Sequence, residues 1–457
     1  MVASEINGAD INNPPLIYDV RITSVGPKNV TGNYTYEPTN MDLAMKLHYI
    51  RVVYFFRSQE LIKGLTPPML KESIFTWLGY YYETCGRFRR FEDTGRPYIK
   101  CNDCGMRFIE AKSEKTVDEW IAMKDSSAHR VLVPDQVLGP ELTFSPTTLM
   151  QMTFLGCGGI AIGFSWAHVL GDAFSLAQYM NSWARLMLNI RPTHPPDLSK
   201  CQPRTDKFPS PIPAHIASGP LAVKKVGPVG DRWINPSSTK MDTYSIHLTS
   251  TKLAQLQDTV FGPKGSGPMR LSPFETICAV MWHAIGRSRS DGTEPTVVTI
   301  IKKNVAKRQT STRDGLSNSQ LVGTVKSDLL VAKANPKDLA ALIHDGVVDE
   351  GAQIVDLEGK EDGTTDVIIY GANLTLVDWE DAPLYGFGLK GVPPSLVNCF
   401  VDGIGEEGVV LVLPGPPLED TDEGCDDDGG GRFVTIILPE GDTSKLKHEL
   451  KQEWSIE

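Results

Sequence analysis

Hydrophobic and polar positions follow two different periods along the chain, and together they predict a protein that mixes strands with helices. Short apolar and β-branched runs predict strands, and apolar residues spaced three and four apart predict amphipathic helices. The run Ser272-Pro273-Phe274-Glu275 is typical of a helix start, with a capping Ser, Pro at the first helical position and Glu at the third. The predicted strands cover residues 16–25, 51–56, 98–101, 106–109, 149–154, 159–166, 243–248, 296–301, 321–331, 366–377, 408–414 and 433–439. The strands at 98–101 and 106–109 are expected to form a hairpin. The predicted helices cover residues 41–49, 67–85, 116–123, 173–190, 276–286, 337–347 and 443–453, and one more begins at Ser250.

Regular patterning stops between residues 191 and 236, where the chain is rich in proline. Proline removes a backbone donor and cannot continue a helix or an inner strand. We therefore expect an N-terminal domain at residues 1–190, a crossover at 191–236 and a C-terminal domain at 237–457. A chain of 457 residues is long enough for two domains of roughly 200 residues each. Some late C-terminal strands are expected to pack back onto the first domain.

Composition narrows the classes of function. Hydrophobic residues make up 41% of the chain and charged residues 22%, which is typical of a globular protein. The formal net charge is −11 and no block of Lys and Arg stands out, so a nucleic-acid partner is not expected. No run of about 18 apolar residues predicts a membrane span, and residues 1–15 lack the apolar core of a signal peptide. The expected location is the cytoplasm, or a membrane surface to which another protein holds the chain.

Three local motifs favour ordinary structural roles over binding. Cys101-Asn102-Asp103-Cys104 is the one CxxC among eight scattered cysteines, and a structural zinc site normally needs a second pair, so no metal is expected. Residues 262–267 (GPKGSG) lack the strand and helix that flank a phosphate-binding loop. The basic run 87–90 (RFRR) is expected on a solvated face, with binding of ligand phosphates or of a partner as the alternative.

The main chemical candidate is His168, which ends a predicted strand and is followed by Gly171 and Asp172 before a predicted helix. Side chains at strand ends commonly face a cleft, and an imidazole can take a proton from a hydroxyl or amine at neutral pH. Such a base lets an alcohol or amine attack an acyl thioester. Asp172 could stabilise the turn by pairing with a cation or with backbone N–H groups. The alternative is a surface or satisfied core histidine, which is the commoner fate of a lone His; His48, His283 and His344, in predicted helices, are interpreted in that way.

The sequence around His168 resembles the HxxxDG-type motif of the BAHD acyl-CoA-dependent acyltransferases of plants, and the chain is similar to that family over essentially its whole length. Within the family it is most similar to the eceriferum and glossy clade, which is associated with cuticular wax. The segments that carry the resemblance are 38–49 (PTNMDLAMKLHY), 95–103 (GRPYIKCND), 138–146 (LGPELTFSP), 164–168 (FSWAH) and 370–375 (YGANLT).

The resemblance implies an α/β fold of two similar domains with mixed sheets, of the CoA-dependent, chloramphenicol acetyltransferase-like type. It places His168 at the position of the family's general base and Asp172 at that of a structural aspartate. It also implies acyl-CoA as ligand or co-substrate, without a permanently bound cofactor. The chain departs from the family at Ala173, where a glycine is usual, and at Gly323-Thr324, where the family has Gly-Asn. The second family motif, DFGWG, aligns with residues 386–390 or 388–392, and neither alignment keeps its Asp or Trp.

Two functions remain open at this point. The resemblance to the clade implies an accessory protein that acts with the condensing enzyme of the fatty-acid elongase at the endoplasmic reticulum, and that promotes elongation of very-long-chain acyl groups for cuticular wax. The degenerate second motif favours this hypothesis, because a base alone supplies only about 10²–10⁴-fold of a rate enhancement. The alternative is a conventional acyl-CoA-dependent O- or N-acyltransferase that uses His168 as general base.

Overall fold

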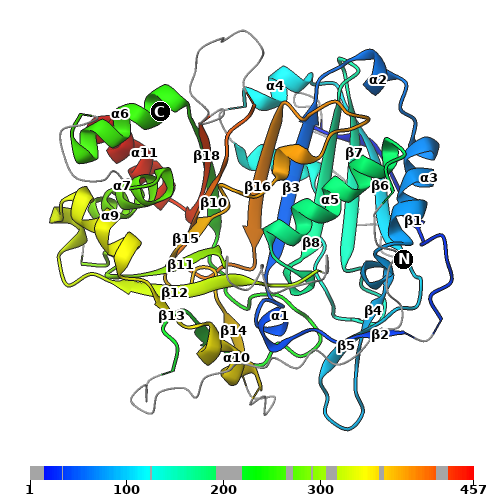
Figure 1. Ribbon diagram of the computed structural model, residues 1–457, viewed down its shortest axis with the longest axis horizontal. Helices are drawn as coiled ribbons and strands as arrows, with labels where there is room; N and C mark the ends of the chain where they lie inside the picture. The colour runs from blue at the N-terminus through cyan, green and yellow to red at the C-terminus, as the bar shows by residue number, and fades with distance from the viewer. Residues whose placement is uncertain are drawn as a thin grey trace.

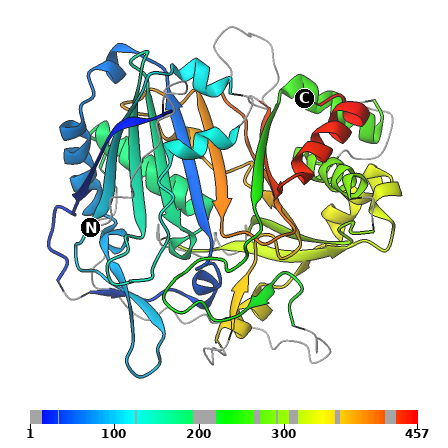
Figure 2. The ribbon, with the colours of Figure 1, turned by 180° about the vertical axis from the view of Figure 1, so that it is seen from behind.

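The computed structural model describes residues 15–32, 34–123, 126–191, 219–263, 271–289, 292–304, 316–359, 365–417 and 431–456. Two large sheets lie side by side, and each sheet is covered by its own set of helices (Figures 1 and 2). Most of the predicted crossover and most of the acidic stretch near residue 425 fall outside the described residues. Within the described ranges, no helix combines the length and the apolar character that crossing a bilayer requires.

The first sheet has six strands and includes one from the C-terminal half of the chain. Its order is β1 (Tyr18–Val25), β6 (Met106–Ser113), β7 (Thr148–Leu155), β8 (Ile160–Ala167), β3 (Tyr49–Phe56) and β16 (Leu396–Asp402). β6 and β7 are parallel, and the other neighbours are antiparallel. β16 lies beside β3 with Leu396 opposite Phe55 and Asp402 opposite Tyr49. A late strand therefore does pack onto the first half, as expected, although the pattern of residues 396–402 did not predict that strand.

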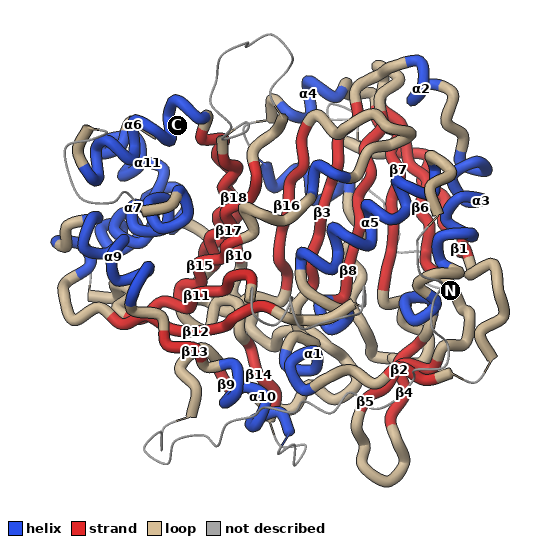
Figure 3. Tube along the Cα trace, in the orientation of Figure 1, coloured by secondary structure: helices blue, strands red, loops and turns tan. Residues whose placement is uncertain are grey.

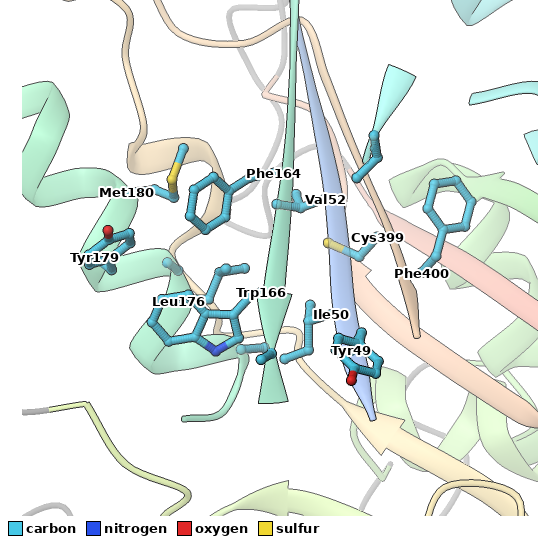
Figure 4. Packing of buried hydrophobic residues seen from close by; sticks show 14 of the residues in the cluster. Tyr49, Ile50, Val52, Phe164, Trp166, Leu176, Tyr179, Met180, Cys399 and Phe400 are labelled. Atoms are coloured by element: carbon cyan, nitrogen blue, oxygen red, sulfur yellow. The ribbon is translucent and has the colours of Figure 1, made fainter. Parts of the chain in front are cut away.

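Helices α3 (Pro67–Leu78) and α5 (Ala173–Met187) cover one face of this sheet (Figure 1). Successive strand residues point to opposite faces, so every second residue of β8 faces α5. Figure 4 shows Phe164 and Trp166 of β8 beside three buried α5 residues, Leu176, Tyr179 and Met180. The Trp166 and Tyr179 ring centroids are 5.1 Å apart. This apolar layer determines where β8 ends and α5 begins, and the His168 turn lies between them.

The second sheet has seven strands in the order β10 (Met241–Leu248), β18 (Arg432–Pro439), β17 (Val409–Pro414), β15 (Leu374–Asp378), β11 (Val297–Lys303), β12 (Gln320–Lys326) and β13 (Val348–Asp349). β15 is parallel to both β11 and β17, so the sheet is mixed. Alternate residues of β17 belong to different hydrophobic cores. Val410 and Val412 pack in the core formed with the helices of this sheet, whereas Val409 and Leu411 pack in the core that includes the first sheet. The covering helices are α6 (Ser250–Phe261), α7 (Pro273–Ser288), α9 (Pro336–Asp345) and α11 (Asp442–Trp454).

Short elements close the ends of the two sheets (Figure 3). β2 (Thr35–Tyr36), β5 (Pro97–Lys100) and β4 (Arg87–Arg90) form a three-stranded sheet, and β9 (Lys224–Val226) pairs with β14 (Asp366–Ile368). The remaining short α-helices in the described residues are α1 (Asn40–Ala44), α2 (Glu60–Lys63), α4 (Val117–Ile121) and α10 (Gly351–Gly359).

Several predicted elements differ from the observed ones. The predicted hairpin of residues 98–101 and 106–109 is wrong, because β5 pairs with β2 and β4 while β6 pairs with β1 and β7. The single strand predicted at 366–377 is two strands in different sheets. The chain turns between them at Gly371, where φ is +79° and a Cβ would lie 2.5 Å from the Gly405 carbonyl oxygen. The helix predicted at 41–49 ends at Ala44, since Tyr49 already pairs with Ala167 in the first sheet.

Candidate active site

His168 occupies a tight turn between β8 and α5. Ala167 is the last strand residue, and His168 begins a single 3₁₀ turn that runs to Leu170. The His168 N–H donates to the carbonyl of His48 at 3.0 Å, and the Asn318 side-chain amide donates to the His168 carbonyl at 2.8 Å. Both backbone groups of His168 are therefore bonded to residues remote in sequence. The side chain is fully buried, at 0% exposure.

The His168 imidazole faces a hydroxyl group that belongs to the protein itself. Its Nε2 atom lies 3.0 Å from the phenolic oxygen of Tyr370, which follows β14. The Gln320 side-chain amide donates to the same oxygen at 3.2 Å. In the tautomer of the neutral imidazole that is protonated at Nδ1, Nε2 accepts the phenolic O–H. The pair thus has the arrangement that a general base and an acceptor hydroxyl adopt before proton transfer.

Burial dominates the proton affinity of the imidazole. It lowers the pKa of His168 from its ordinary value to about 4, although nearby groups act in the opposite direction. These groups are the His168 carbonyl, the Asn318 side chain and the charge of Asp42, which all favour the protonated form. Burial also raises the pKa of the Tyr370 phenol far above its usual range. At neutral pH the imidazole is thus unprotonated and the phenol keeps its proton.

A second histidine completes the cluster, and the sequence patterns did not assign it to the site. His48 is fully buried, and its ring centroid lies 5.0 Å from that of Tyr370 and 6.5 Å from that of His168. The Ile369 N–H donates to His48 Nε2 at 3.1 Å. Burial, followed by the nearby His168, lowers the pKa of His48 to about 3. The one signal that could have drawn attention to His48 is its place in the segment 38–49, which carries part of the family resemblance.

Asp172 lies at the N-terminus of α5 and bonds to two backbone segments. Its Oδ1 accepts from the Ser175 N–H at 2.9 Å, which makes it the N-cap of the helix. Its Oδ2 accepts from the Ser319 N–H at 3.1 Å. A carboxylate with this pair of donors stabilises the helix start and holds residues 316–319 against it. The backbone N–H groups that the sequence allowed as partners of Asp172 are thus present in the structure.

Residues 316–319, which we call the 316–319 segment, run across the His168 turn just before β12. The Ser317 carbonyl accepts from the Asp172 N–H at 3.2 Å and from the Ser175 hydroxyl at 2.9 Å. This close contact requires glycine at position 171, because a Cβ there would lie 2.9 Å from the Ser317 nitrogen. The glycine between His168 and Asp172 therefore lets the two halves of the chain meet.

Asp42 connects α1 to the same segment and is fully buried. Its Oδ1 accepts from the backbone N–H and the side-chain amide of Asn318, at 3.0 and 2.9 Å. Its Oδ2 accepts from the backbone N–H and the hydroxyl of Thr39, at 2.9 and 2.8 Å, within the capping box of α1. Asp42 therefore belongs both to the cap of α1 and to a long-range contact with Asn318.

The region aligned with the second family motif lies against the other end of α5. Phe387 is fully buried, and its ring stacks on Trp183 at a centroid distance of 5.3 Å. The Asn181 side-chain amide donates to the Pro383 carbonyl at 2.9 Å. Trp183 is 11 residues beyond Asp172, which corresponds to about 16 Å along the helix at 1.5 Å per residue. Phe387, the aromatic of the alignment at 386–390, therefore belongs to the core and lies far from the His168 turn along α5.

The other motifs of the sequence do not form a second site in the described part of the chain. Arg87 is buried and donates to the Gly86 and Gly105 carbonyls, so only part of the basic run 87–90 faces solvent, contrary to expectation. Cys101 is buried, whereas Cys104 is exposed, and neither forms a disulfide. Among the described residues, no group of three or more His, Cys, Asp or Glu side chains could hold a metal ion. Most of the 262–267 run lies outside the described residues.

Solved structures share this fold. The chain superposes on vinorine synthase with a TM-score of 0.65 at 16% identity, covering 94% of this chain and 96% of that one. It superposes on F. graminearum TRI101, in a complex with coenzyme A and deoxynivalenol, with a TM-score of 0.66 at 14% identity, covering 92% and 98%. The predicted fold class, a mixed α/β acyltransferase fold, is thereby confirmed.

Sequence comparison gives the family. Protein ECERIFERUM 26 of Arabidopsis thaliana is 37% identical over 437 residues, covering 95% of this chain and 96% of that protein. Protein ECERIFERUM 2 of the same plant is 34% identical over 448 residues, covering 95% and 98%. A family model described as "Transferase family" matches residues 21–453. The chain therefore belongs to the BAHD acyl-CoA-dependent acyltransferase family, in which it is similar to the ECERIFERUM proteins.

Proposed function

We propose that this protein promotes the elongation of very-long-chain fatty acyl groups for cuticular wax, as an accessory to the condensing enzyme of the fatty-acid elongase. In this proposal the acyltransferase fold handles an acyl-CoA or its long chain without transferring the acyl group to an alcohol or amine. The protein acts in the cytoplasm or at the surface of the endoplasmic reticulum, where the condensing enzyme holds it. The domain division at 1–190, 191–236 and 237–457 is part of the same proposal.

The observation that carries the proposal is the pairing of His168 with Tyr370. A general base needs a free nitrogen within about 3 Å of the acceptor proton. Here the nitrogen is 3.0 Å from a hydroxyl of the protein's own chain, in a fully buried position. The pKa of about 4 also makes the imidazole a weak proton acceptor at neutral pH. Both features favour a ligand-binding or architectural function over acyl transfer.

The relatives and the second motif support the same proposal. Proteins named ECERIFERUM match nearly the whole chain at 34–37% identity. The region of the family's DFGWG motif lacks both the Asp and the Trp, and its Phe387 packs in the core. We infer that His168 keeps the family's position without working as a base, and that Asp172 has a structural role at the start of α5.

An acyl-CoA is the proposed ligand, and no permanently bound cofactor is part of the proposal. Its support is that the TRI101 neighbours include complexes with coenzyme A and with ethyl coenzyme A. Binding can be measured by titrating the protein with palmitoyl-CoA and following the heat released. Saturable binding of palmitoyl-CoA that free palmitate does not reproduce would support the thioester as ligand.

The accessory function can be tested in a host that makes only shorter acyl chains. The condensing enzyme is expressed alone, with this protein, and with its His168→Ala variant, and the acyl chains are profiled by mass spectrometry. We expect the parent and the variant to lengthen the chains equally. If neither lengthens them, the accessory function is wrong; if only the parent does, base catalysis is needed for it.

A conventional acyl-CoA-dependent O- or N-acyltransferase is the second candidate. The observation that favours it is the intact turn at the end of β8, where a neutral imidazole at a strand end meets a hydroxyl at 3.0 Å. Incubation with acyl-CoA and a panel of alcohols and amines tests it directly. Formation of an ester or amide that disappears in His168→Ala would favour this candidate over the accessory function.

A further inference from the structure

We propose that Tyr370 is the residue that prevents acyl-group chemistry at His168, because its hydroxyl occupies the place of an acceptor molecule. The proposal goes beyond the accessory function, since it assigns the loss of acyl transfer to one side chain. It also implies that the protein would hydrolyse acyl compounds if that side chain were removed. It rests on the proposed function in one respect only, namely that an acyl thioester is the ligand. The experiment below separates that ligand from the blocking role.

The hydrogen bonds of the phenol are those that a substrate hydroxyl would make. Its oxygen lies 3.0 Å from His168 Nε2 and receives the Gln320 amide at 3.2 Å. The phenolic oxygen lies within hydrogen-bond distance of the nitrogen that would remove a proton from an acceptor. The acceptor position therefore carries a hydroxyl that is covalently part of the chain and held by two partners.

The location of Tyr370 makes this hydroxyl hard to displace. Tyr370 is fully buried, and the residue before it donates its N–H to His48 Nε2 at 3.1 Å. The Gly371 N–H donates to the Thr375 hydroxyl at 2.9 Å, and the Gly405 N–H donates to the Tyr370 carbonyl at 2.8 Å. The backbone on both sides of the tyrosine is thus fixed, so the ring cannot leave the site through a simple rotation of an exposed loop.

Removal of the phenol would leave a space that water can occupy. A buried water is stable where two to four polar partners surround it, whereas an apolar void stays dry. His168 Nε2 and the Gln320 amide are two such partners, already placed around a single oxygen atom. Truncation of the tyrosine therefore replaces the fixed phenol hydroxyl with a water molecule, which can form a hydrogen bond with the same imidazole.

The chemistry expected in the opened site is hydrolysis of an activated acyl compound. The water oxygen attacks the acyl carbonyl carbon while its proton passes to His168 Nε2, and a C–O bond forms. The tetrahedral intermediate then expels the thiolate or phenolate, so the C–S or C–O bond to the leaving group breaks. The imidazolium returns its proton to the leaving group. The products are a carboxylic acid and a thiol or phenol, and neither an oxidant nor a metal takes part.

The test compares the parent, Tyr370→Ala and Tyr370→Ala/His168→Ala with p-nitrophenyl butyrate as probe. Release of p-nitrophenolate is followed by absorbance, and folding is checked by circular dichroism and thermal melting. We expect Tyr370→Ala to release p-nitrophenolate at least about 10²-fold faster than the double variant, the lower end of what a general base contributes. The parent should not exceed the double variant. A folded Tyr370→Ala protein no faster than the double variant would overturn the proposal.

Tyr54→Ala is the matched control for a loosened core. Tyr54 is as fully buried as Tyr370. It lies five residues along β3 from Tyr49, which pairs with Ala167 next to His168, so it is about 17 Å from the His168 turn at 3.4 Å per residue. Activity equal to that of Tyr370→Ala in this control would also contradict a specific blocking role. If Tyr370→Ala does not fold, Tyr370→Leu keeps an apolar side chain in the core while removing the hydroxyl, and the same outcomes decide.

Palmitoyl-CoA distinguishes the blocking role from the proposed ligand. Tyr370→Ala should release palmitate and coenzyme A from it, and His168→Ala in the same background should abolish the release. If the butyrate ester is hydrolysed but palmitoyl-CoA is not, the blocking role of Tyr370 stands and the acyl-CoA ligand is wrong. If neither is hydrolysed by a folded variant, Tyr370 does not block a working base.

Discussion

The side-chain amide nitrogen of Asn318 donates to the His168 carbonyl at 2.8 Å and to Asp42 Oδ1 at 2.9 Å. This one nitrogen joins three segments that are far apart in sequence: α1, the turn after β8 and the 316–319 segment before β12. All three residues are buried, so the bonds are shielded from competing water. The position of the candidate base thus depends on residues contributed by both halves of the chain.

Replacement of Asn318 by Ala should destabilise the protein. The change removes both bonds of the amide and leaves the buried Asp42 carboxylate with fewer donors, which costs about 1–3 kcal/mol for an unsatisfied buried group. Urea unfolding followed by circular dichroism measures the difference. Asn29→Ala is the control, because Asn29 is exposed. A loss no larger than that of the control would show that the amide contributes little to the turn.

Asp172→Ala should cost more than the loss of an ordinary helix cap. The variant loses the Ser175 N–H bond at the start of α5 and the Ser319 N–H bond to the other half of the chain. A cap contributes about 0.5–2 kcal/mol, and a hydrogen bond to a charged group about 1.5–3 kcal/mol. Urea unfolding of Thr249→Ala gives the comparison, since Thr249 caps α6 by accepting from Lys252. If the two variants lose the same free energy of unfolding, the bond to Ser319 does not contribute to stability.

Acid should destabilise the protein through the buried imidazoles of His168 and His48. In the folded protein the pKa values of His168 and His48 are about 4 and about 3, whereas both groups titrate near 6.5 in the unfolded chain. Between these values the unfolded chain binds more protons, so stability falls as the pH drops below about 6.5 and levels off only below the folded pKa values. Each imidazole should account for about 2 kcal/mol of loss between pH 7 and pH 5, at 1.36 kcal/mol per pKa unit.

The measurement is the free energy of unfolding at pH 7 and pH 5 for the parent and for His48→Gln. Glutamine does not titrate, so the variant should lose less stability over this interval than the parent, by roughly the share of one imidazole. The difference between the two proteins removes the contribution of carboxylates, which also titrate in acid. Identical pH dependence in both would show that His48 is not held neutral by burial.

Phe387→Ala should destabilise the core without involving the His168 cluster. Phe387 is fully buried against Trp183 and Tyr54, and truncation of such a phenylalanine costs about 3–5 kcal/mol. Phe144→Ala is the matched control, because Phe144 is 72% exposed and should change stability by no more than about 0.5 kcal/mol. Thermal melting or urea unfolding distinguishes them. A small effect of Phe387→Ala would mean that Phe387 does not stabilise the core.

Sequence patterns predicted the elements that contain strong local signals. β8, the start of α5 and the start of α7 lie close to where apolar period, turn residues and capping placed them; Ser272 is the N-cap of α7 and accepts from the Glu275 N–H. The patterns missed β16 and gave one strand where β14 and β15 are separate, because these features depend on pairing with distant strands. Local periodicity carries no information about which strands become neighbours.

The candidate site divides in the same way. The spacing of His168, Gly171 and Asp172 identified a turn with a base and a structural carboxylate, since each residue acts on its immediate neighbours along the chain. Asn318 and Gln320 could not be placed there, because nothing in their local sequence distinguishes them from other polar residues. His48 and Tyr370 lie in segments that carry the family resemblance, but their local patterns gave neither residue a role at the site. The sequence alone therefore determined the family, the turn and the chemical type of its side chains. Only the tertiary structure decided that a tyrosine 202 residues further along the chain meets the imidazole, because burial and long-range packing bring them together.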